Sequence, residues 1–176
     1  MNEKIRIAPA AEGDAPLLAQ QMSHAEREYK NYLRLQKEGK ATYLVAWEDK
    51  TPVGHLLIRW DGSLEIPRIV DRMPMAVKFA GYPSFESIKV RLDRRKRGIG
   101  TALIRHAELL VRQRGFEQAV IEVDIDNPSA RALYECLGYA ESGLGEFTTS
   151  GTCVDDDGHI VEWTNGPQIL LIKKLR

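Results

Sequence analysis

The sequence predicts one α/β (α+β) domain with helices on the faces of a central β-sheet. The length of 176 residues suits a single domain, and no repeat, low-complexity tract or Gly/Ser linker divides it. Segments with strand and helix periodicity follow the order β-α-α-β-β-β-α-β-α-β-β, which favours a layered sheet. We therefore treat residues 1–176 as one domain.

The N-terminal half is expected to contain a strand, two helices and a β-hairpin. "KIRIAP" is a short first strand, and Asp14 is placed to cap the helix that follows. Ser23 and Glu26 have the spacing of a capping box for a second helix, which ends near Gly39. "TYLVAWEDKTPVGHLLIRW" predicts two strands joined by a turn at Asp49–Pro52.

The C-terminal half is expected to alternate strands and helices and to end in a hairpin. Residues 62–82 are interrupted by Pro and Gly and predict no clear element. "SFESIKVRL" predicts a strand, residues 99–114 a helix that ends at Gly115, and "EQAVIEVDI" the next strand. "NPSARALYECLG" predicts a helix capped by Asn127. "DDDG" at Asp155–Gly158 predicts the turn before a last strand, "QILLIKKL".

The composition excludes several classes of protein. Lys and Arg together number 25, as do Asp and Glu, so the zero net charge disfavours a general nucleic-acid binder. No apolar run approaches the about 20 residues of a membrane span, and the charged start "MNEKIRIAP" lacks the apolar core of a signal peptide. Cys136 and Cys153 form no disulfide framework. We expect a cytoplasmic protein with no nucleic-acid or membrane partner.

The segment "DRRKRGIGTALI" at residues 93–104 gathers cations where a helix is expected to begin. A helix N-terminus is already positive, so added cations favour an anion at this position. A strand, a glycine-bearing turn and a helix bring main-chain N–H groups together around a phosphate. Gly98 and Gly100 would allow close approach because they carry no Cβ. The alternative is a solvated cationic turn whose glycines serve only the bend.

Two motifs in this part of the chain resemble those of the GNAT-type N-acetyltransferases. "RKRGIG" at Arg95–Gly100 is similar to the signature Arg/Gln-x-x-Gly-x-Gly/Ala. "NPSARALYECLGY" at Asn127–Tyr139 is similar to the second motif of that family, and one helix and one strand separate the two. The resemblance implies a mixed, mostly antiparallel sheet of six to seven strands flanked by about four helices.

The resemblance implies acetyl-CoA as the co-substrate, with its pyrophosphate held by the glycine loop. The residues implied to bind it are Val90, Leu92, Arg95, Arg97, Gly98, Gly100, Thr101, Asn127 and Ala130. In the family, the strand before the loop separates from its neighbour, and the pantetheine arm pairs with its open edge. Asn127 is equally explained as the cap of its own helix.

The resemblance also implies a direct transfer of the acetyl group to an amine. Tyr134 matches the tyrosine that protonates the departing thiolate, although its helical spacing also suits a core position. Glu86 is the candidate general base, since alternation along a strand would place it on the same side as Ile88 and Val90. Glu122, Asp124 or a water molecule are alternative bases. The scattered histidines predict no metal site.

The acceptor is expected to be a primary amine of a small molecule. The candidate acceptor-binding residues are Tyr29, Trp60, Asp61 and Tyr82. Core packing of the aromatic residues and solubility of the acidic one are the alternative interpretations. A protein or peptide N-acetyltransferase, and a non-catalytic acyl-CoA-binding regulatory domain, remain as alternative functions. The protein is expected to be a monomer or a homodimer.

Overall fold

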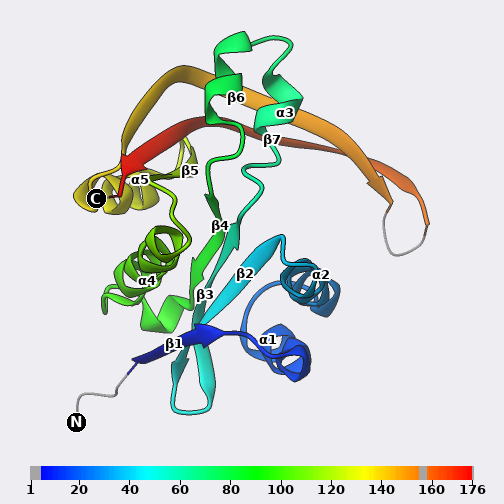
Figure 1. Cartoon of the computed structure of the whole chain (residues 1–176). Helices are drawn as coiled ribbons and strands as arrows, with labels where there is room; N and C mark the ends of the chain where they lie inside the picture. Colours follow the sequence, from blue (N-terminus) through cyan, green and yellow to red (C-terminus); the bar gives the residue numbers. More distant parts are fainter. Residues whose placement is uncertain (1–4, 155–157, 176) are drawn as a thin grey trace.

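The protein is built on one seven-stranded sheet with the order β1-β2-β3-β4-β5-β7-β6 (Figure 1). The computed structural model describes residues 5–154 and 158–175. The strands are β1 (Ile5–Pro9), β2 (Ala41–Glu48), β3 (Thr51–Arg59), β4 (Ser84–Val90), β5 (Gln118–Asp124), β6 (Ala140–Val154) and β7 (Ile160–Lys174). Every neighbouring pair is antiparallel except β4 and β5. The predicted mixed, mostly antiparallel sheet is confirmed.

Helices cover both faces of this sheet, as predicted. The α-helices are α1 (Ala15–Gln21), α2 (Glu26–Lys37), α3 (Ile66–Ile69), α4 (Ile99–Gln113) and α5 (Pro128–Cys136), and the 3-10 turns are η1 (Glu12–Asp14), η2 (Pro74–Phe79) and η3 (Leu92–Arg94). The short α3 and η2 lie within residues 62–82, a segment for which the sequence predicted no clear element.

The starts of the first two helices differ from the prediction. Asp14 precedes α1, but its carboxylate accepts the N–H of Ala11 (2.8 Å) and so closes η1 instead of capping α1. The capping box at Ser23 and Glu26 was wrong, because the N-cap of α2 is Ala25. Instead of a cap, a hydrogen bond from the N–H of His24 to the hydroxyl of Tyr29 holds the chain before α2 (3.2 Å). Tyr29 lies in the first turns of that helix.

The core lies in two layers, one on each face of the sheet. On one face, α4 packs through Leu103 and Ala107 against alternate residues of β2 and β3, including Leu56. On the other face, α1 and α2 pack against the intervening residues, including Leu57. Figure 1 shows α1 and α2 on the opposite side of the sheet from α4 and α5. Because both faces of the sheet are buried, the register of the strands is fixed, and with it the layer to which each side chain belongs.

A β-bulge at Ser87 interrupts β4. Ser87 has a φ of 50°, and the register between β3 and β4 shifts by one residue there. Glu86 lies opposite Leu57 and therefore faces the layer of α1 and α2, whereas Ile88 and Val90 pack in the α4 layer. The prediction that Glu86 shares a side with Ile88 and Val90 was wrong, because the extra residue reverses the alternation.

The strands β4 and β5 separate soon after they meet. Their parallel pairing consists of Ser84 with Val120 and Phe85 with Ile121. By contrast, β5 pairs with β7 from Gln118 to Asp124. Beyond Phe85, the edge of β4 therefore faces an opening in the middle of the sheet instead of a neighbouring strand.

The strands β6 and β7 form the predicted hairpin and extend beyond the rest of the sheet as a long ribbon (Figure 1). Of the predicted turn at Asp155–Gly158, only Gly158 lies within the described residues. Cys136 is a free, exposed thiol, and the side chain of Cys153 lies outside the description. Among the described helices, none combines the length and the apolarity required to cross a membrane.

The contact between α4 and β3 can be tested at Gly54. A Cβ at this position would lie 3.0 Å from the carbonyl oxygen of Lys89 and 3.2 Å from side-chain atoms of Ile99 and Leu103. We expect Gly54→Ala to lower the free energy of unfolding by about 1–3 kcal/mol, because the layer has no room for the methyl group. Urea denaturation measures the change.

Gly13→Ala is the matched control for this substitution. A Cβ on Gly13 would meet no atom within 4 Å beyond its chain neighbours, and Gly13 has no positive φ. We expect its effect on stability to stay within about 0.5 kcal/mol. Equal effects of the two substitutions would contradict a tight contact between α4 and β3.

Candidate active site

The glycine loop leads directly into α4, as the sequence predicted. Gly98 occupies the N-cap position with a φ of 79°, a conformation that favours glycine. The first N–H groups of α4 have no partners within the helix and are available to an anion. A Cβ on Gly100 would lie 3.3 Å from Cδ2 of Leu133 and 3.8 Å from Cγ2 of Val90. Gly100 therefore keeps the space between the loop, β4 and α5 open.

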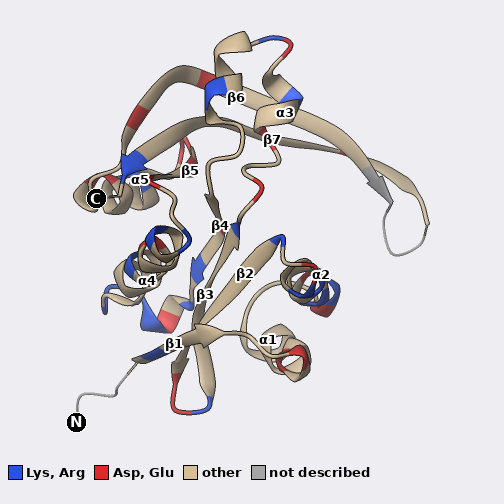
Figure 2. Ribbon diagram, viewed as in Figure 1, with Lys and Arg blue, Asp and Glu red and all other residues tan. Residues whose placement is uncertain are grey.

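The basic residues around the loop divide into two groups. Asp93 accepts hydrogen bonds from Arg91 (3.1 and 3.0 Å) and from Arg94 (2.9 Å), and Arg94 also donates to Glu48 (2.7 Å). Figure 2 shows these charges of both signs gathered on the segment between β4 and α4. This first group therefore holds the loop to the body of the protein.

The second group faces a cleft beside the loop. Arg95 donates from Nε to the carbonyl oxygen of Val90 (3.2 Å), and both Arg95 and Lys96 line the cleft. Lys96 has a φ of 60°, so the backbone turns sharply just before Gly98. Arg94 also lines the cleft, but its guanidinium binds Asp93 and Glu48, so Arg95 and Lys96 are the other side chains of the basic run that an anion in the cleft would meet.

This loop cleft has a volume of about 430 Å³ and lies between β4, the start of α4 and α5. The predicted cofactor residues that line it are Val90, Arg95, Gly98, Gly100, Thr101, Asn127 and Ala130. Leu92 and Arg97 are not among its lining residues. Leu92 is 79% exposed because β4 ends at Val90 and Leu92 begins η3. The prediction that Leu92 contacts the cofactor assumed that β4 continues to Leu92, two residues beyond its observed end at Val90.

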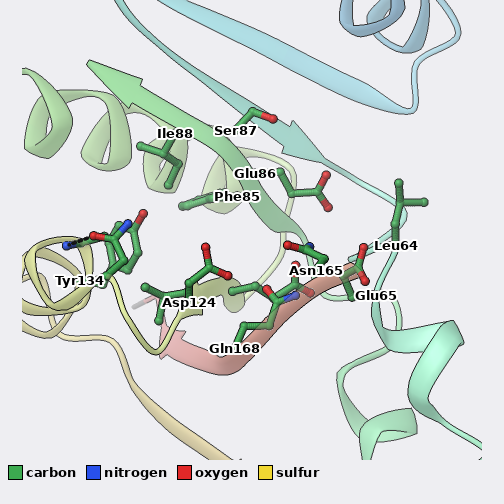
Figure 3. A pocket seen from close by; sticks show the side chains of 14 residues that line it. Leu64, Glu65, Phe85, Glu86, Ser87, Ile88, Asp124, Tyr134, Asn165 and Gln168 are labelled. Carbon is green, nitrogen blue, oxygen red and sulfur yellow. Dashed lines mark hydrogen bonds between the residues drawn. The ribbon is translucent and has the colours of Figure 1, made fainter. Parts of the chain in front are cut away.

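A second cleft of about 330 Å³ opens on the side of the sheet that faces α3 (Figure 3). Its lining residues are Leu64, Glu65, Phe85, Glu86, Ser87, Ile88, Glu122, Val123, Asp124, Asn127, Ala130, Tyr134, Asn165 and Gln168. We call it the acidic cleft, since four of these residues are carboxylic acids. The acidic cleft and the loop cleft share Ile88, Asn127, Ala130 and Tyr134. They therefore meet where β4 and β5 separate.

Glu86 lies in the wall of the acidic cleft beside Arg59. Its Oε1 is 3.9 Å from Nε of Arg59, too far for a hydrogen bond, and has no hydrogen-bond partner among the described residues. Burial, together with repulsion by Glu122, raises the pKa of Glu86 to about 8. Arg59 only partly offsets this, because Asp61 accepts two hydrogen bonds from the same guanidinium (3.0 and 2.9 Å).

The neighbouring strand contributes two further carboxylates to the acidic cleft. Burial raises the pKa of Glu122 to about 7, although Ser63 donates a hydrogen bond to its carboxylate. The pKa of Asp124 is also raised, by burial and by the negative charge of Asp126. Glu86 and Glu122 thus both titrate near neutral pH, where a general base is most effective.

Tyr134 stands at the junction of the two clefts and is buried by its ring. Burial and the nearby carboxylate of Asp124 raise the pKa of its phenol to about 12. The hydroxyl therefore stays protonated at neutral pH and can act as an acid. Asn127 caps α5 by accepting the N–H of Ala130 (3.2 Å), and it lines both clefts. The position of Asn127 thus agrees both with a role as helix cap and with a role in cofactor binding.

The four predicted acceptor residues lie outside the lining of the acidic cleft. Tyr29 is fully buried among the aromatic residues of the α2 layer, and Trp60 stacks on Phe116 in the α4 layer. Tyr82 packs beside α3, while Asp61 binds Arg59 as described above. The alternative of core packing therefore accounts for the aromatic residues.

Several polar lining residues had no signal in the sequence. Glu65 comes from the segment for which the sequence predicted no element, and Asn165 and Gln168 come from β7. Figure 3 shows Glu65, Glu86 and Asp124 directed toward the same space. Only the pairing of β5 with β7, which sets Gln168 opposite Asp124, brings β7 to the cleft. In the described part of the chain, no group of three or more His, Cys, Asp or Glu side chains could hold a metal ion.

Comparison with solved structures shows the same fold in several N-acetyltransferases. The structure of an N-acetyltransferase from Staphylococcus aureus superposes with a TM-score of 0.66 at 13% identity, covering 98% of this chain and 99% of that one. A ribosomal-protein-alanine N-acetyltransferase from Brucella melitensis gives 0.65 at 18% identity, with 97% and 99% covered. The PaiA N-acetyltransferase from Thermoplasma acidophilum, in complex with coenzyme A, gives 0.65 at 15% identity, with 97% and 99% covered.

Comparison of the sequence with protein families agrees with the fold. A comparison with curated proteins finds no match. The acetyltransferase (GNAT) family matches residues 11–139, which include the glycine loop, the separating strands and Tyr134. With more than half of its length matched and both motifs in place, this chain belongs to the acetyltransferase (GNAT) family.

Proposed function

We propose that this protein is an acetyl-CoA-dependent N-acetyltransferase that acts on a primary amine of a small molecule in the cytoplasm. The observation that carries the proposal is the meeting of two clefts of different chemistry at Tyr134. One cleft offers bare main-chain N–H groups and cations, which suits a pyrophosphate. The other offers carboxylates, which suit an amine.

The loop cleft fits acetyl-CoA by its donor set and its shape. Gly98 and the first turn of α4 would hold the pyrophosphate, with Arg95 and Lys96 as cationic partners. Beyond Phe85, β4 no longer pairs with β5, so its edge can pair with the amide groups of an extended arm. The bound co-substrate supplies the acetyl group through its thioester, whose C–S bond breaks as the new C–N bond forms.

The chain itself supplies an acid and a base on opposite sides of this junction. Glu86 takes the proton that the amine loses as it attacks, and Glu122 is the alternative acceptor of that proton. Tyr134 donates its hydroxyl proton to the departing sulfur. Val90, beside the glycine loop, is the residue whose main-chain N–H the family resemblance assigns to the carbonyl oxygen. No residue of the chain needs to become covalently modified.

The volume of the acidic cleft supports a small acceptor. At about 330 Å³ it lies at the lower end of the range for small-molecule sites, about 300–1,000 Å³. Its walls come from four parts of the chain, namely the segment before α3, the β4–β5 opening, α5 with its N-cap, and β7. A small amine can be enclosed by these walls.

Binding of the co-substrate is tested by substitutions at two glycines near opposite ends of α4. Gly98→Trp is expected to weaken coenzyme A binding at least about tenfold, equivalent to about 1.4 kcal/mol, because the side chain would fill the loop cleft. Isothermal titration calorimetry measures this affinity. Gly115→Trp is the control, since Gly115 has a similar φ (84° against 79°) and likewise open surroundings. Equal losses in both variants would contradict the proposed anion site.

The role of Tyr134 is tested by removing its hydroxyl. Tyr134→Phe is expected to lower kcat about 100-fold without weakening acetyl-CoA binding, because only the acid is lost. Thiol release with saturating acetyl-CoA and the best amine of a small-amine panel measures kcat. Tyr43→Phe also removes a buried hydroxyl, but one outside both clefts, and should leave kcat unchanged. A Tyr134→Phe variant with full kcat would exclude this residue as the acid.

The pKa of Glu86 predicts a rise in activity with pH. Since this pKa is about 8, the basic form is scarce at pH 6, and kcat/KM should increase until about pH 8. Glu86→Gln should remove this inflection and lower kcat/KM about 100-fold. A pH–rate profile of both proteins is the measurement. An unchanged inflection in Glu86→Gln would assign the base to another group, with Glu122 the first candidate.

The raised pKa of Glu86 can also be tested by measuring protein stability, which requires no acceptor. Between pH 4.5 and about 8, folded Glu86 holds its proton more tightly than unfolded Glu86, so its contribution to stability falls as pH rises. Glu86→Gln should therefore be more stable than the wild type at pH 8, by about 1 kcal/mol, or about 2–4 °C in Tm. The difference should disappear near pH 4.

A further inference from the structure

The acidic cleft carries more negative charge than the protein neutralises. Four carboxylic acids line it, namely Glu65, Glu86, Glu122 and Asp124. The cation beside them is Arg59, whose side chain is only 7% exposed and already binds both carboxylate oxygens of Asp61. It reaches Glu86 only at 3.9 Å. Near neutral pH Glu86 largely holds its proton, so the charge that Arg59 leaves uncompensated lies mainly on the other carboxylates of the cleft.

Unused polar atoms in the wall of the cleft independently indicate a ligand. Gln168 is 3% exposed, and within the described ranges its Nε2 has no hydrogen-bond partner. Oε2 of Glu65 and Oε1 of Glu86 are likewise buried without hydrogen bonds in the described part of the protein. Buried polar atoms normally have partners, so these three atoms mark positions where a polar ligand would satisfy them. Gln168 lies on β7, the strand at the floor of the cleft in Figure 3.

The amine that reacts cannot supply the missing positive charge. It must be neutral when it attacks, since an ammonium has no lone pair, and its proton neutralises at most one carboxylate. The other carboxylates then still face one another in a partly buried site. Like charges at such a site are relieved by uptake of a proton, as at Glu86, or by a bound cation. A bound cation does so throughout the reaction only if it stays protonated.

We propose that the acceptor carries a second cationic group, and that the carboxylates of Glu65 and Asp124 bind this group while the first amine is acetylated. Small linear diamines and polyamines have this chemistry. The inference rests on the proposed function and narrows its substrate class. An acceptor with a carboxylate next to its amine, such as a free amino acid, would be repelled by the same cleft. A peptide N-terminus brings one amine and no second cation.

Kinetic comparison of three amines with the same four-carbon chain tests the second cation. These are 1,4-diaminobutane, 1-aminobutane and 4-amino-1-butanol, each with saturating acetyl-CoA and thiol release as the readout. We expect kcat/KM to be at least about 30-fold higher for the diamine, because it alone places a charge against the carboxylates. The amino alcohol separates charge from polarity, since its hydroxyl can hydrogen-bond to Gln168 without a positive charge. Equal kcat/KM for all three would overturn the proposal.

Isosteric variants assign the effect to the cleft. Glu65→Gln and Asp124→Asn remove one charge each with little change in volume, and each should lower kcat/KM for the diamine about tenfold. The ratio of kcat/KM for the diamine to kcat/KM for 1-aminobutane should fall in each variant, so the preference for the diamine shrinks. Glu117→Gln is the matched control, because Glu117 is exposed, immediately precedes β5 and lines neither cleft. A diamine preference that survives both cleft variants would overturn the assignment of Glu65 and Asp124.

Titration of coenzyme A and of 1,4-diaminobutane separates this inference from the proposed function. If coenzyme A does not bind, the proposed function fails and the inference falls with it. If coenzyme A binds but a peptide beginning with alanine, or an amino acid, is acetylated faster than the diamine, the proposed function stands as N-acetylation and the second cation is refuted. Calorimetric binding of the diamine to the coenzyme A complex, weakened about tenfold or more in the doubly substituted E65Q and D124N protein, supports the inference.

Discussion

The separation of β4 from β5 is the constraint on which the rest of the site depends. A sheet normally pairs its interior strands along their whole length, yet these two pair only at Ser84 and Phe85 of β4. The bulge at Ser87 follows at once, and the hydroxyl of Tyr32 on α2 meets Oγ of Ser87 at 2.9 Å. This contact, together with the pairing to β3, holds a strained residue in place. The bulge directs Glu86 to the acidic cleft and Ile88 to the α4 layer, where Ile88 borders both clefts.

Because the opening passes between two buried layers, each side of it has its own chemistry. The α4 layer brings a helix N-terminus and bare glycines, which favour negative charge. The opposite side brings carboxylates whose pKa values are raised by burial and by one another. The two sides share only a few residues, with Tyr134 among them. An anionic and a cationic reactant can therefore approach the same point from opposite directions.

The parts predicted correctly from the sequence are those that depend on local patterns. The loop at Arg95–Gly100, the cap at Asn127 and the helices that follow them each lie within about 15 consecutive residues of sequence. The prediction at Glu86 chose a residue that lines the cleft but used the wrong alternation. No local signal marks Ser87 as the extra residue, because its positive φ results from contacts with α2 and β3.

Several polar residues of the acidic cleft could not be predicted because they come together only through pairings distant in sequence. Gln168 reaches the cleft only because β7 inserts between β5 and β6, a strand order that the linear pattern does not specify. Glu65 follows a turn that Ser63 organises while it binds Glu122. The predicted aromatic residues Tyr29 and Trp60 lie instead in the core, where burial of a large ring contributes to stability. A hydrophobic residue is placed by its own burial, whereas the polar groups of a cleft are placed by the elements that carry them.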